Sequence, residues 1–568
     1  MKAVSRIISC IPIIVLVLIL LGRFHIAMVR FFDPDEFANM HWSWLIAGGL
    51  VPYRDFFYYN LMFYQWLLVP IFWLPNSHVL AYLSRFWHYI IYIFSLILLY
   101  RISYRFSGQK ITAIMAVLIM AAFPMTFDKT IDIRADMPMI VFLLLTIELL
   151  IQKRPLSSWK YLTAGITMSL SILMLQKIVY GLPAVIYLFL LSKPKPLIHK
   201  LLLITLGGLI PAGIFIGYLS IHGALIKGIN AITIDTITVN AGKLPFSPWK
   251  ALSPYPLVYV AQAGISFPWI LNSVIWIMSL IGAVIFFIKR PDRMLFILLF
   301  FIAGWIFVFL FANPYLQYFM PFSVFVSFLA AYVLWPLSQL IFKLLHIPSA
   351  IILNTLSVIL SMCLLYSFFL QYRQRVADSA NNAEQVQVLK DITEISTPAD
   401  TAYDMVGSYI FLRDGYIICC HPYAEFVDKL NRPYPTLRES LLKNQTKFLI
   451  LDRTGMSLWQ PKPDDLNFLV THYLPSEYKK IYIPGMSLAC NNGVCSQLNI
   501  HGQATDIVNN TVEPVVAGEY SLTIDPPSST IWLNGIPHSQ STLKLDNRLY
   551  AFTVDPQTRM FSVRLKLP

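Results

Sequence analysis

Long apolar runs separated by short polar loops fill the chain up to Gln371, and the pattern changes at Tyr372. A helix needs about 20 mainly apolar residues to cross the hydrocarbon core of a bilayer. A shorter apolar and aromatic stretch, 61–74, is followed by Pro75 and predicts a helix lying at the membrane interface. Eleven runs reach or approach the spanning length and predict membrane helices: residues 7–29, 82–100, 111–127, 137–152, 159–175, 178–192, 201–220, 268–288, 294–312, 319–342 and 349–370.

The segment after Tyr372 has the composition of a soluble region. A helical stretch at 384–395 and apolar runs at 448–451 and 480–483 predict a small α/β unit. Short alternating runs then follow, with Asn534-Gly535 as a hairpin turn, and predict a β-sandwich. The predicted fold class is therefore a polytopic α-helical membrane protein of about eleven spans with a C-terminal α/β plus β-sandwich region. The predicted domains are 1–371, 372–488 and 489–568.

Composition supports the membrane assignment. The chain is 57% hydrophobic and 13% charged, with a mean hydropathy of +0.62, whereas soluble domains carry about 25% charged residues. Residues 1–371 contain 25 lysines and arginines against 10 aspartates and glutamates, a net charge of +15, and the remainder contains 18 against 20. The positive charge therefore belongs to the membrane half, where it reports topology and gives no indication of nucleic acid as a partner.

The distribution of basic residues predicts the orientation. The first run follows Lys2 and Arg6 and has no small-x-small cleavage site after it, so it predicts an uncleaved span rather than a signal peptide. With the N-terminus in the cytoplasm, every short loop on that side is basic, as the positive-inside rule requires. We therefore predict a multi-pass inner (plasma) membrane protein whose acidic first loop and C-terminal region are extracytoplasmic. The basic loop residues are Arg101, Arg105, Lys110, Lys153, Arg154, Lys160, Lys193, Lys195, Lys200, Lys289, Arg290, Arg293 and Lys343.

Cysteine spacing suggests one disulfide. Cys490 and Cys495 flank a short Asn-Asn-Gly-Val loop and are the candidates, which would suit an oxidising compartment. Cys419 and Cys420 are adjacent, an arrangement that rarely forms a disulfide. The sequence contains no metal-ligand cluster, so no metal ligand is predicted and a requirement for a divalent metal stays open.

Ionisable residues gather at the predicted outer ends of the spans. Such groups are costly next to hydrocarbon and by default mark a functional site. Together they predict one membrane-level cavity lined by carboxylates, cations and aromatic rings. The residues are Asp33, Asp35, Glu36, Arg54 and Asp55 in the first loop; Asp128, Lys129, Asp132, Arg134 and Asp136 in the second; Lys177 after the fifth span; and Tyr315 and Tyr318 in a late turn.

This set of residue types suits a lipid-linked sugar phosphate. Lysine and arginine can hold a phosphate and stabilise the negative charge that grows as it leaves. A carboxylate can take the proton of an acceptor hydroxyl as general base, and aromatic rings can stack on a sugar.

Each residue also has a structural interpretation. Asp33 and Asp136 suit N-caps, because a carboxylate at that position accepts hydrogen bonds from the first helical N–H groups. For Asp35 and Glu36 the alternative is a purely structural role at the start of a helix. The other structural alternatives are an Asp132–Arg134 ion pair, snorkelling of Lys177 to the headgroups, an interfacial aromatic belt at Tyr53–Tyr64, and ordinary interfacial positions for His41 and His88.

Four motifs lie at the predicted outer ends of the spans: Asp35-Glu36 with Trp44–Gly49 and Val51–Phe56, Ile133-Arg134-Ala135-Asp136-Met137-Pro138, Leu175-Gln176-Lys177, and Tyr315–Pro321. Together they resemble membrane glycosyltransferases of the GT-C fold, specifically the bacterial branch related to protein O-mannosyltransferases and the lipid A aminoarabinose transferase. The resemblance covers roughly residues 1–345, with a looser match in the C-terminal α/β segment.

The resemblance implies inverting transfer of a hexosyl or pentosyl group from a polyprenyl-phosphate donor, as in lipopolysaccharide modification. A glycolipid, a polysaccharide and a protein all stay open as the envelope acceptor. The family's essential acid falls on Asp35 with Glu36 beside it, its second-loop acid on Asp136, and its phosphate-holding lysine on Lys177. Candidate substrate contacts are Arg54, Asp55, Arg134, Lys177, Tyr315 and Tyr318. The chain departs from several relatives at Phe57–Met62, where they carry Glu or Lys with His or Pro close behind, which leaves the sugar open.

Two other classes of function compete with the enzyme. A transporter or flippase for a lipid-linked glycan would place ionisable residues near mid-membrane and show internal repeats. Here the charges gather at one face and no repeat is evident, which favours the enzyme. The third alternative is a binding protein whose terminal β-sandwich recruits polysaccharide while the membrane part is inactive.

Overall fold

The chain divides into two compact units. The computed structural model describes residues 2–152, 156–240, 266–309, 316–377, 381–420, 430, 434–451, 462–507, 511–539 and 541–567. The first unit, called the helical unit, contains Met1–Arg30, Tyr59–Leu67 and Tyr82–Asn381. The second, called the mixed unit, contains Phe31–Tyr58, Leu68–Ala81 and Asn382–Pro568. The acidic first loop, Phe31–Tyr58, thus belongs to the same unit as the C-terminal region.

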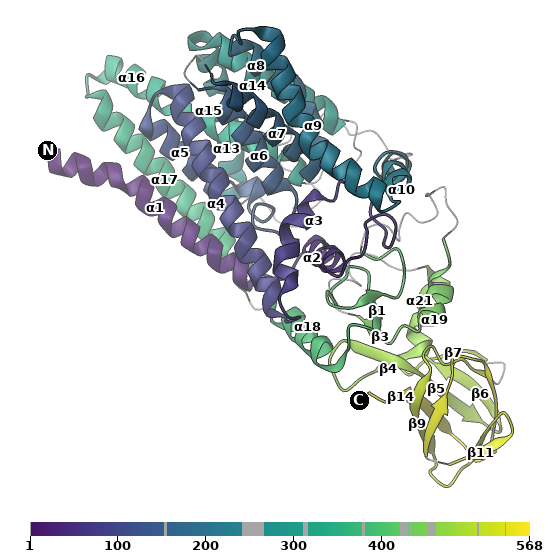
Figure 1. The fold of residues 1–568 in the computed structure, drawn as a ribbon. Helices are drawn as coiled ribbons and strands as arrows, with labels where there is room; N and C mark the ends of the chain where they lie inside the picture. Colours follow the sequence, from purple (N-terminus) through teal and green to yellow (C-terminus); the bar gives the residue numbers. More distant parts are fainter. Residues whose placement is uncertain are drawn as a thin grey trace. The chain divides into compact units, whose positions relative to one another are not determined.

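All eleven predicted spans are helical within the described residues (Figure 1). Seven helical stretches there are long and apolar enough to cross a membrane, judged by length and composition. This confirms a polytopic helical membrane protein. The seven are α1 (Lys2–Val29), α4 (Val79–Ser107), α9 (Leu197–Ile221), α13 (Phe267–Lys289), α14 (Pro291–Phe309), α15 (Met320–Tyr332) continuing into α16 (Leu334–Leu345), and α17 (Ser349–Arg375).

The other four predicted spans form shorter helices. They are α5 (Lys110–Ala122), α6 (Asp136–Leu150), α7 (Ser158–Met174) and α8 (Leu182–Leu191). The 13 residues of α5 extend about 20 Å, less than the hydrocarbon thickness of about 30 Å. Backbone that is not helical at membrane depth has to be buried in protein or line a cavity. Most side chains of α5 and α6 are indeed buried inside the bundle.

Proline sets one of these short ends. The apolar run 111–127 stops being helical at Ala122, because Phe123 precedes Pro124 and adopts an extended conformation with ψ of 115°. A residue before proline is disfavoured in the helical region. The run at 178–192 likewise starts as a 3₁₀ turn, η3 (Gln176–Gly181), and becomes α-helical only at Leu182. The charged loop Asp128–Asp136 follows α5, and Lys177 lies on η3, just before α8.

Two glycines allow α7 and α9 to pack backbone against backbone. A Cβ at Gly165 would overlap the carbonyl oxygen of Ile204, and one at Gly207 would overlap that of Leu162. Small residues at such crossings are a common means of packing membrane helices, since apolar burial alone does not drive association in lipid. The crossing fixes the position of α7, which in turn packs on α6.

Shorter elements complete the membrane part. The stretch predicted as an interfacial helix forms α3 (Phe63–Leu68) and a 3₁₀ turn, η1 (Val69–Trp73). Most of the predicted outer loop 221–267 lies outside the described residues. The remaining elements are η2 (Pro124–Thr126), α10 (Leu225–Asn230), a π-helical turn η4 (Ala231–Asp235), α11 (Thr236–Asn240) and η5 (Leu316–Phe319).

The mixed unit contains α2 (Pro34–Ala47) and the predicted C-terminal sheets. Three parallel strands in the order β3-β1-β2 form the α/β part, with α18 at Ala383–Ile395 as the predicted helix. Its other elements are α19 (Leu437–Lys443), α21 (Pro463–His472), β1 (Thr401–Tyr403), β2 (Arg413–Asp414), β3 (Phe448–Ile450) and β4 (Tyr473–Pro475).

Antiparallel strands form the end of the chain (Figure 1). A buried cluster that includes Leu488, Ile531 and Phe561 fills the space between two sheets. Asn534 and Gly535 both have positive φ, as expected for the predicted tight hairpin turn. The strands are β5 (Ile481–Asn491), β6 (Val494–Leu498), β7 (Ala504–Ile507), β8 (Thr511–Val512), β9 (Gly518–Asp525), β10 (Ile531–Leu533), β11 (Ile536–His538), β12 (Ser541–Leu545), β13 (Tyr550–Val554) and β14 (Met560–Leu565).

One strand is shared by both parts of the mixed unit. The first residues of β5 pair with β3 and β4, and its later residues pair with β6 and β14. The expected border at 488/489 therefore falls within a single strand. Cys490 and Cys495 lie opposite each other on β5 and β6 and are joined by a disulfide.

The expectation for the other cysteine pair was wrong. Cys419 and Cys420 are joined by a disulfide although they are adjacent in sequence. Both side chains are buried, and Cys420 has a positive φ of 67°. Spacing alone does not reveal this disulfide.

Candidate active site

Three charged side chains converge at the start of α6, and we call them the α6 cluster: Arg134, Asp136 and Lys177. The Lys177 ammonium, on η3, donates to the Asp136 carboxylate and to the Gln317 carbonyl oxygen at 3.3 Å. Nε of Arg134 donates to the other Asp136 oxygen at 3.4 Å. The exposed fractions of the three side chains are only 12%, 3% and 10%. One buried carboxylate therefore faces two buried cations.

An aromatic ring completes the cluster. The Lys177 ammonium lies 4.9 Å from the centre of the Tyr318 ring, on η5, close enough for a cation–π attraction. Four predicted site residues from three distant segments thus come together. Tyr315, predicted beside them, lies outside the described residues.

Other residues near Lys177 were missed from the sequence. Tyr180 follows Lys177 by three positions on the 3₁₀ turn, where such side chains lie over one another. Its hydroxyl is buried and has no hydrogen-bond partner among the described residues. Gln176 donates to the Asn60 side chain at 2.9 Å, and Asn60 lies within Phe57–Met62, where the chain departs from several relatives. The sequence around Tyr180 and Gln176 is mostly apolar and gives no sign of the buried hydroxyl or of the Gln176–Asn60 hydrogen bond.

The rest of the second loop forms a separate ion-pair network. Asp132 pairs with Arg30 and Lys129, whereas the Arg134–Asp136 pair belongs to the α6 cluster. Arg375 donates to Asp128 at 2.9 and 3.1 Å. Burial raises the pKa of Asp128, but the guanidinium groups of Arg375 and Arg30 outweigh it and hold the pKa well below its usual range. This network ties the ends of α1 and α17 to the loop.

In the mixed unit, the first acidic motif caps α2. Asp33 is the N-cap, and its carboxylate accepts from the backbone N–H of Asp35 at 3.1 Å. Glu36 is fully buried and accepts from the backbone N–H of Asp33 at 2.9 Å, which completes a capping box. The capping alternative for Asp33 is confirmed, and Glu36 has a structural contact. The half-buried Asp35 carboxylate is not part of the box.

Arg54 and Asp55 pair with each other. Two guanidinium nitrogens of Arg54 donate to the two carboxylate oxygens at 2.8 Å. Asp55 also accepts from the backbone N–H of Val51 at 2.7 Å, closing a tight turn in which Tyr53 has φ of 64°. This pair, predicted to contact substrate, therefore stabilises the loop that carries it.

His41, expected to be an ordinary interfacial histidine, is fully buried in an ion pair. Its Nδ1 lies 2.9 Å from the Ile410 carbonyl oxygen and its Nε2 lies 2.8 Å from the Asp414 carboxylate. Both partners are acceptors, so only the doubly protonated ring satisfies both. Burial lowers the pKa of His41, but the Asp414 carboxylate outweighs it and leaves the pKa raised above 6.5. Asp414 lies on β2, so the sequence around His41 gave no signal of this contact.

One group in the described residues has the residue types of a metal site. His41, Cys419 and Cys420 place ligand atoms within 4.8 Å of one another. Both ring nitrogens of His41 are hydrogen-bonded, however, and the two sulfurs are bonded to each other. The group does not fit a bound metal.

Comparisons with known proteins agree with this architecture. Residues 62–220 match the family described as dolichyl-phosphate-mannose-protein mannosyltransferase. The crystal structure of ArnT from Cupriavidus metallidurans bound to undecaprenyl phosphate has a TM-score of 0.56 at 13% identity, over 83% of this chain and 97% of that chain. Its apo state has a TM-score of 0.55 at 13% identity over the same shares. No curated protein matches the chain in sequence.

At this identity the likeness concerns the fold. The match spans nearly the whole of the solved chain, and the family match falls on α3 to α9 of the helical unit. The chain has the GT-C fold of membrane glycosyltransferases.

Proposed function

We propose that the protein transfers a sugar from a polyprenyl-phosphate donor to an envelope acceptor at the extracytoplasmic face, with inversion at the anomeric carbon. The observation that carries the proposal is the α6 cluster, in which two buried cations surround one carboxylate. The fold of ArnT, solved with undecaprenyl phosphate, supports the class of donor. The basic loops of the helical unit support the orientation.

Lys177 and Arg134 are the proposed phosphate-binding residues. Both cations contact one carboxylate, Asp136, and two cations held this close together suit a phosphate. In a site of low dielectric constant, fixed cations stabilise a leaving phosphate more strongly than they would in water. Asp136 keeps both cations in position before the donor binds. Tyr318 offers a ring face next to the phosphate, where the sugar of the donor is attached, and Tyr315 is proposed to act with it.

Asp35 is the proposed general base. The acceptor hydroxyl oxygen attacks the anomeric carbon, and the bond from that carbon to the phosphate oxygen breaks. Its electron pair leaves with the phosphate, and Asp35 takes the hydroxyl proton. Asp33 and Glu36 form the capping box, and the half-buried Asp35 carboxylate is not a member of it. Arg54 and Asp55 position the neighbouring turn.

Binding and transfer can be tested separately. Purified full-length protein is titrated with undecaprenyl phosphate and the bound lipid is measured by native mass spectrometry. We expect Lys177→Gln to weaken binding at least about tenfold, and Lys343→Gln, an exposed lysine on α16, to leave it unchanged. Equal binding of undecaprenyl phosphate by Lys177→Gln and wild type would show that Lys177 does not bind the phosphate.

Transfer is measured by mass spectrometry of envelope glycolipids from cells with and without the gene, looking for one missing sugar. We expect Asp35→Asn to reproduce the deletion while retaining undecaprenyl phosphate binding, because loss of a general base costs about 10²–10⁴-fold in rate. A transporter would instead change the distribution of the carrier lipid between leaflets. If the variant changes the distribution of the carrier lipid but leaves sugar transfer normal, the protein is a flippase and the proposed enzyme function is wrong.

A further inference from the structure

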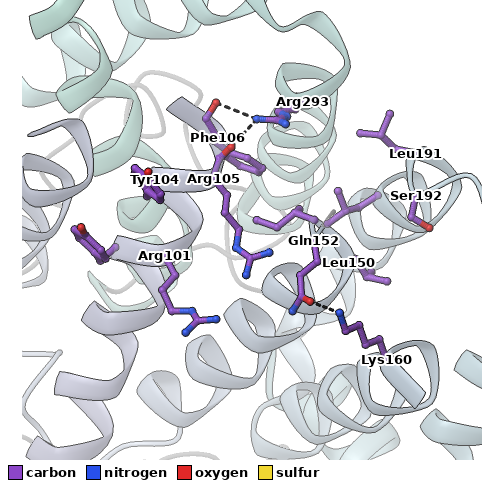
Figure 2. Close-up of a pocket in the computed structure, with 13 residues that line it drawn as sticks. Arg101, Tyr104, Arg105, Phe106, Leu150, Gln152, Lys160, Leu191, Ser192 and Arg293 are labelled. Atoms are coloured by element: carbon purple, nitrogen blue, oxygen red, sulfur yellow. Dashed lines mark hydrogen bonds between the residues drawn. The ribbon is translucent and has the colours of Figure 1, made fainter. Parts of the chain in front are cut away.

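A large cavity lies at the other end of α6. It has a volume of about 1070 Å³ and lies between the ends of α4, α6, α8 and α14 (Figure 2). Leu150, in its lining, is fourteen positions after Asp136 on one helix, which corresponds to about 21 Å. The cavity is therefore separate from the α6 cluster. Its volume is that of a site for a sizeable ligand.

The lining is strongly basic. Four cationic side chains, Arg101, Arg105, Lys160 and Arg293, contribute to it. Among the described residues, one carboxylate pairs with two of these cations: Oε1 of Glu148 accepts from Arg101 and Arg105 at 2.8 Å each. One negative charge against four positive charges leaves an excess that favours an anion.

The four cations are held in different ways. Arg293 donates to the backbone carbonyls of Arg105 and Phe106 at 2.8 and 3.0 Å and so fixes the end of α4. Lys160 donates to Gln152. The Arg101 and Arg105 side chains are 53% and 30% exposed, and in Figure 2 they extend from α4 toward the side where Gln152 and Lys160 lie. Guanidinium groups in such a position can bind phosphate oxygens in pairs.

The remaining lining is apolar and aromatic. Tyr100 and Tyr104 from α4 and Leu188 and Leu191 from α8 contribute to it. A soluble anion needs no such surface, whereas a lipid has a glycerol and acyl region next to its phosphate. Basic pockets between membrane helices are known as sites for anionic lipid headgroups.

We propose that this cavity binds the phosphate headgroup of an anionic membrane lipid, with Arg101, Arg105 and Lys160 as the phosphate contacts. The site is independent of the sugar donor and acceptor, and it does not depend on the proposed transfer reaction. Glu148 orients the two guanidinium groups and competes with the lipid phosphate for them.

The test uses the purified full-length protein in a zwitterionic detergent. Phosphatidylglycerol, phosphatidylcholine and inorganic phosphate are added in separate arms, and bound lipid is measured by native mass spectrometry with the unfolding temperature as a second readout. We expect phosphatidylglycerol alone to bind and stabilise. Arg101→Gln with Lys160→Gln, which keeps Arg105 to pair with Glu148, should bind it roughly 10–30-fold more weakly. Lys343→Gln, the matched control, should bind as wild type.

A second variant has the opposite expected sign. Glu148→Gln removes the competing carboxylate and should tighten phosphatidylglycerol binding roughly three- to fivefold. A damaged fold would not produce a gain, so this variant separates binding from stability. The proposal is overturned if phosphatidylcholine binds equally, if Lys343→Gln loses as much as the double variant, or if Glu148→Gln binds more weakly. Displacement of the lipid by millimolar inorganic phosphate would identify a soluble phosphate as the ligand instead.

Discussion

The two ends of α6 use the same charges in different surroundings. At each end one buried carboxylate pairs with two cations: Asp136 with Lys177 and Arg134, and Glu148 with Arg101 and Arg105. The cations at the Asp136 end are nearly buried, whereas those at the Glu148 end border an open cavity. From this difference we expect burial, more than the pairing pattern, to decide what such a triad contributes to stability and what it can bind.

The largest expected difference is in stability. Asp136→Asn removes the buried carboxylate that pairs with Lys177 and Arg134 and should cost about 3–5 kcal/mol of unfolding free energy. Glu148→Gln leaves two solvent-accessible guanidinium groups and should cost at most about 1 kcal/mol. Denaturant unfolding of the detergent-solubilised protein measures both. An equal or larger loss for Glu148→Gln would break the comparison.

The next difference concerns a hydroxyl at the buried end. Tyr180→Phe keeps the ring packed against Phe300 and Phe322 and removes only the hydroxyl. We expect undecaprenyl phosphate binding to weaken about three- to tenfold, the net effect of one typical hydrogen bond. Tyr92→Phe removes another buried hydroxyl, on α4, that has no partner among the described residues, and should leave this binding unchanged. Equal effects of the two variants would argue against a role for Tyr180.

Salt should separate the two ends as well. The Debye length falls from about 10 Å at 0.1 M to about 3 Å at 1 M, and exposed charges are screened far more than buried ones. Phosphatidylglycerol binding at the cavity should therefore weaken several-fold over this range. Binding of undecaprenyl phosphate at the α6 cluster should change less. Parallel titrations of the two lipids at both salt concentrations make the measurement, and equal salt dependence would place the two sites in similar surroundings.

The smallest expected effect comes from a buried pair whose cation can lose its charge. The pKa of His41 is raised in the folded state, so its contribution to stability is fully present below 6.5 and is lost as pH rises through the folded-state pKa. The unfolding temperature should fall over that interval. Asp414→Asn removes the cause of the raised pKa and should flatten this part of the profile. If the unfolding temperature of Asp414→Asn falls with pH as steeply as that of wild type, another titrating group causes the fall.

Local patterns predicted the helices and much of the cluster. Apolar length identified all eleven helical runs, and unusual charges at their ends identified Arg134, Asp136 and Lys177. Partners far apart in sequence could not be predicted: Arg30 and Arg375 join the Asp128 network, and Asp414 pairs with His41 only after β2 has formed. Such contacts depend on tertiary packing and leave no local trace.

Two further signals were present but were interpreted too narrowly. Glu148 is a lone acid in an apolar run, and intramembrane acids by default indicate function. Arg101, Arg105, Lys160 and Arg293 were interpreted only as topology determinants, although three separate basic loops that converge can also form a binding site. The number of basic residues in a loop predicts the side of the membrane on which the loop lies. It does not predict which loops contact one another in the folded protein.

The strand β5 limits how this protein can be rearranged. Because one continuous strand contributes to both the parallel α/β sheet and the terminal sandwich, the last eighty residues are not an exchangeable cassette. A truncation before β6 would remove β14, which pairs with β5 on one side and with β9 on the other. A chimera joined there would require a relative whose strands pair with β5 in the same register. Recombination among related chains should therefore place crossovers upstream of β5 or leave this whole region intact.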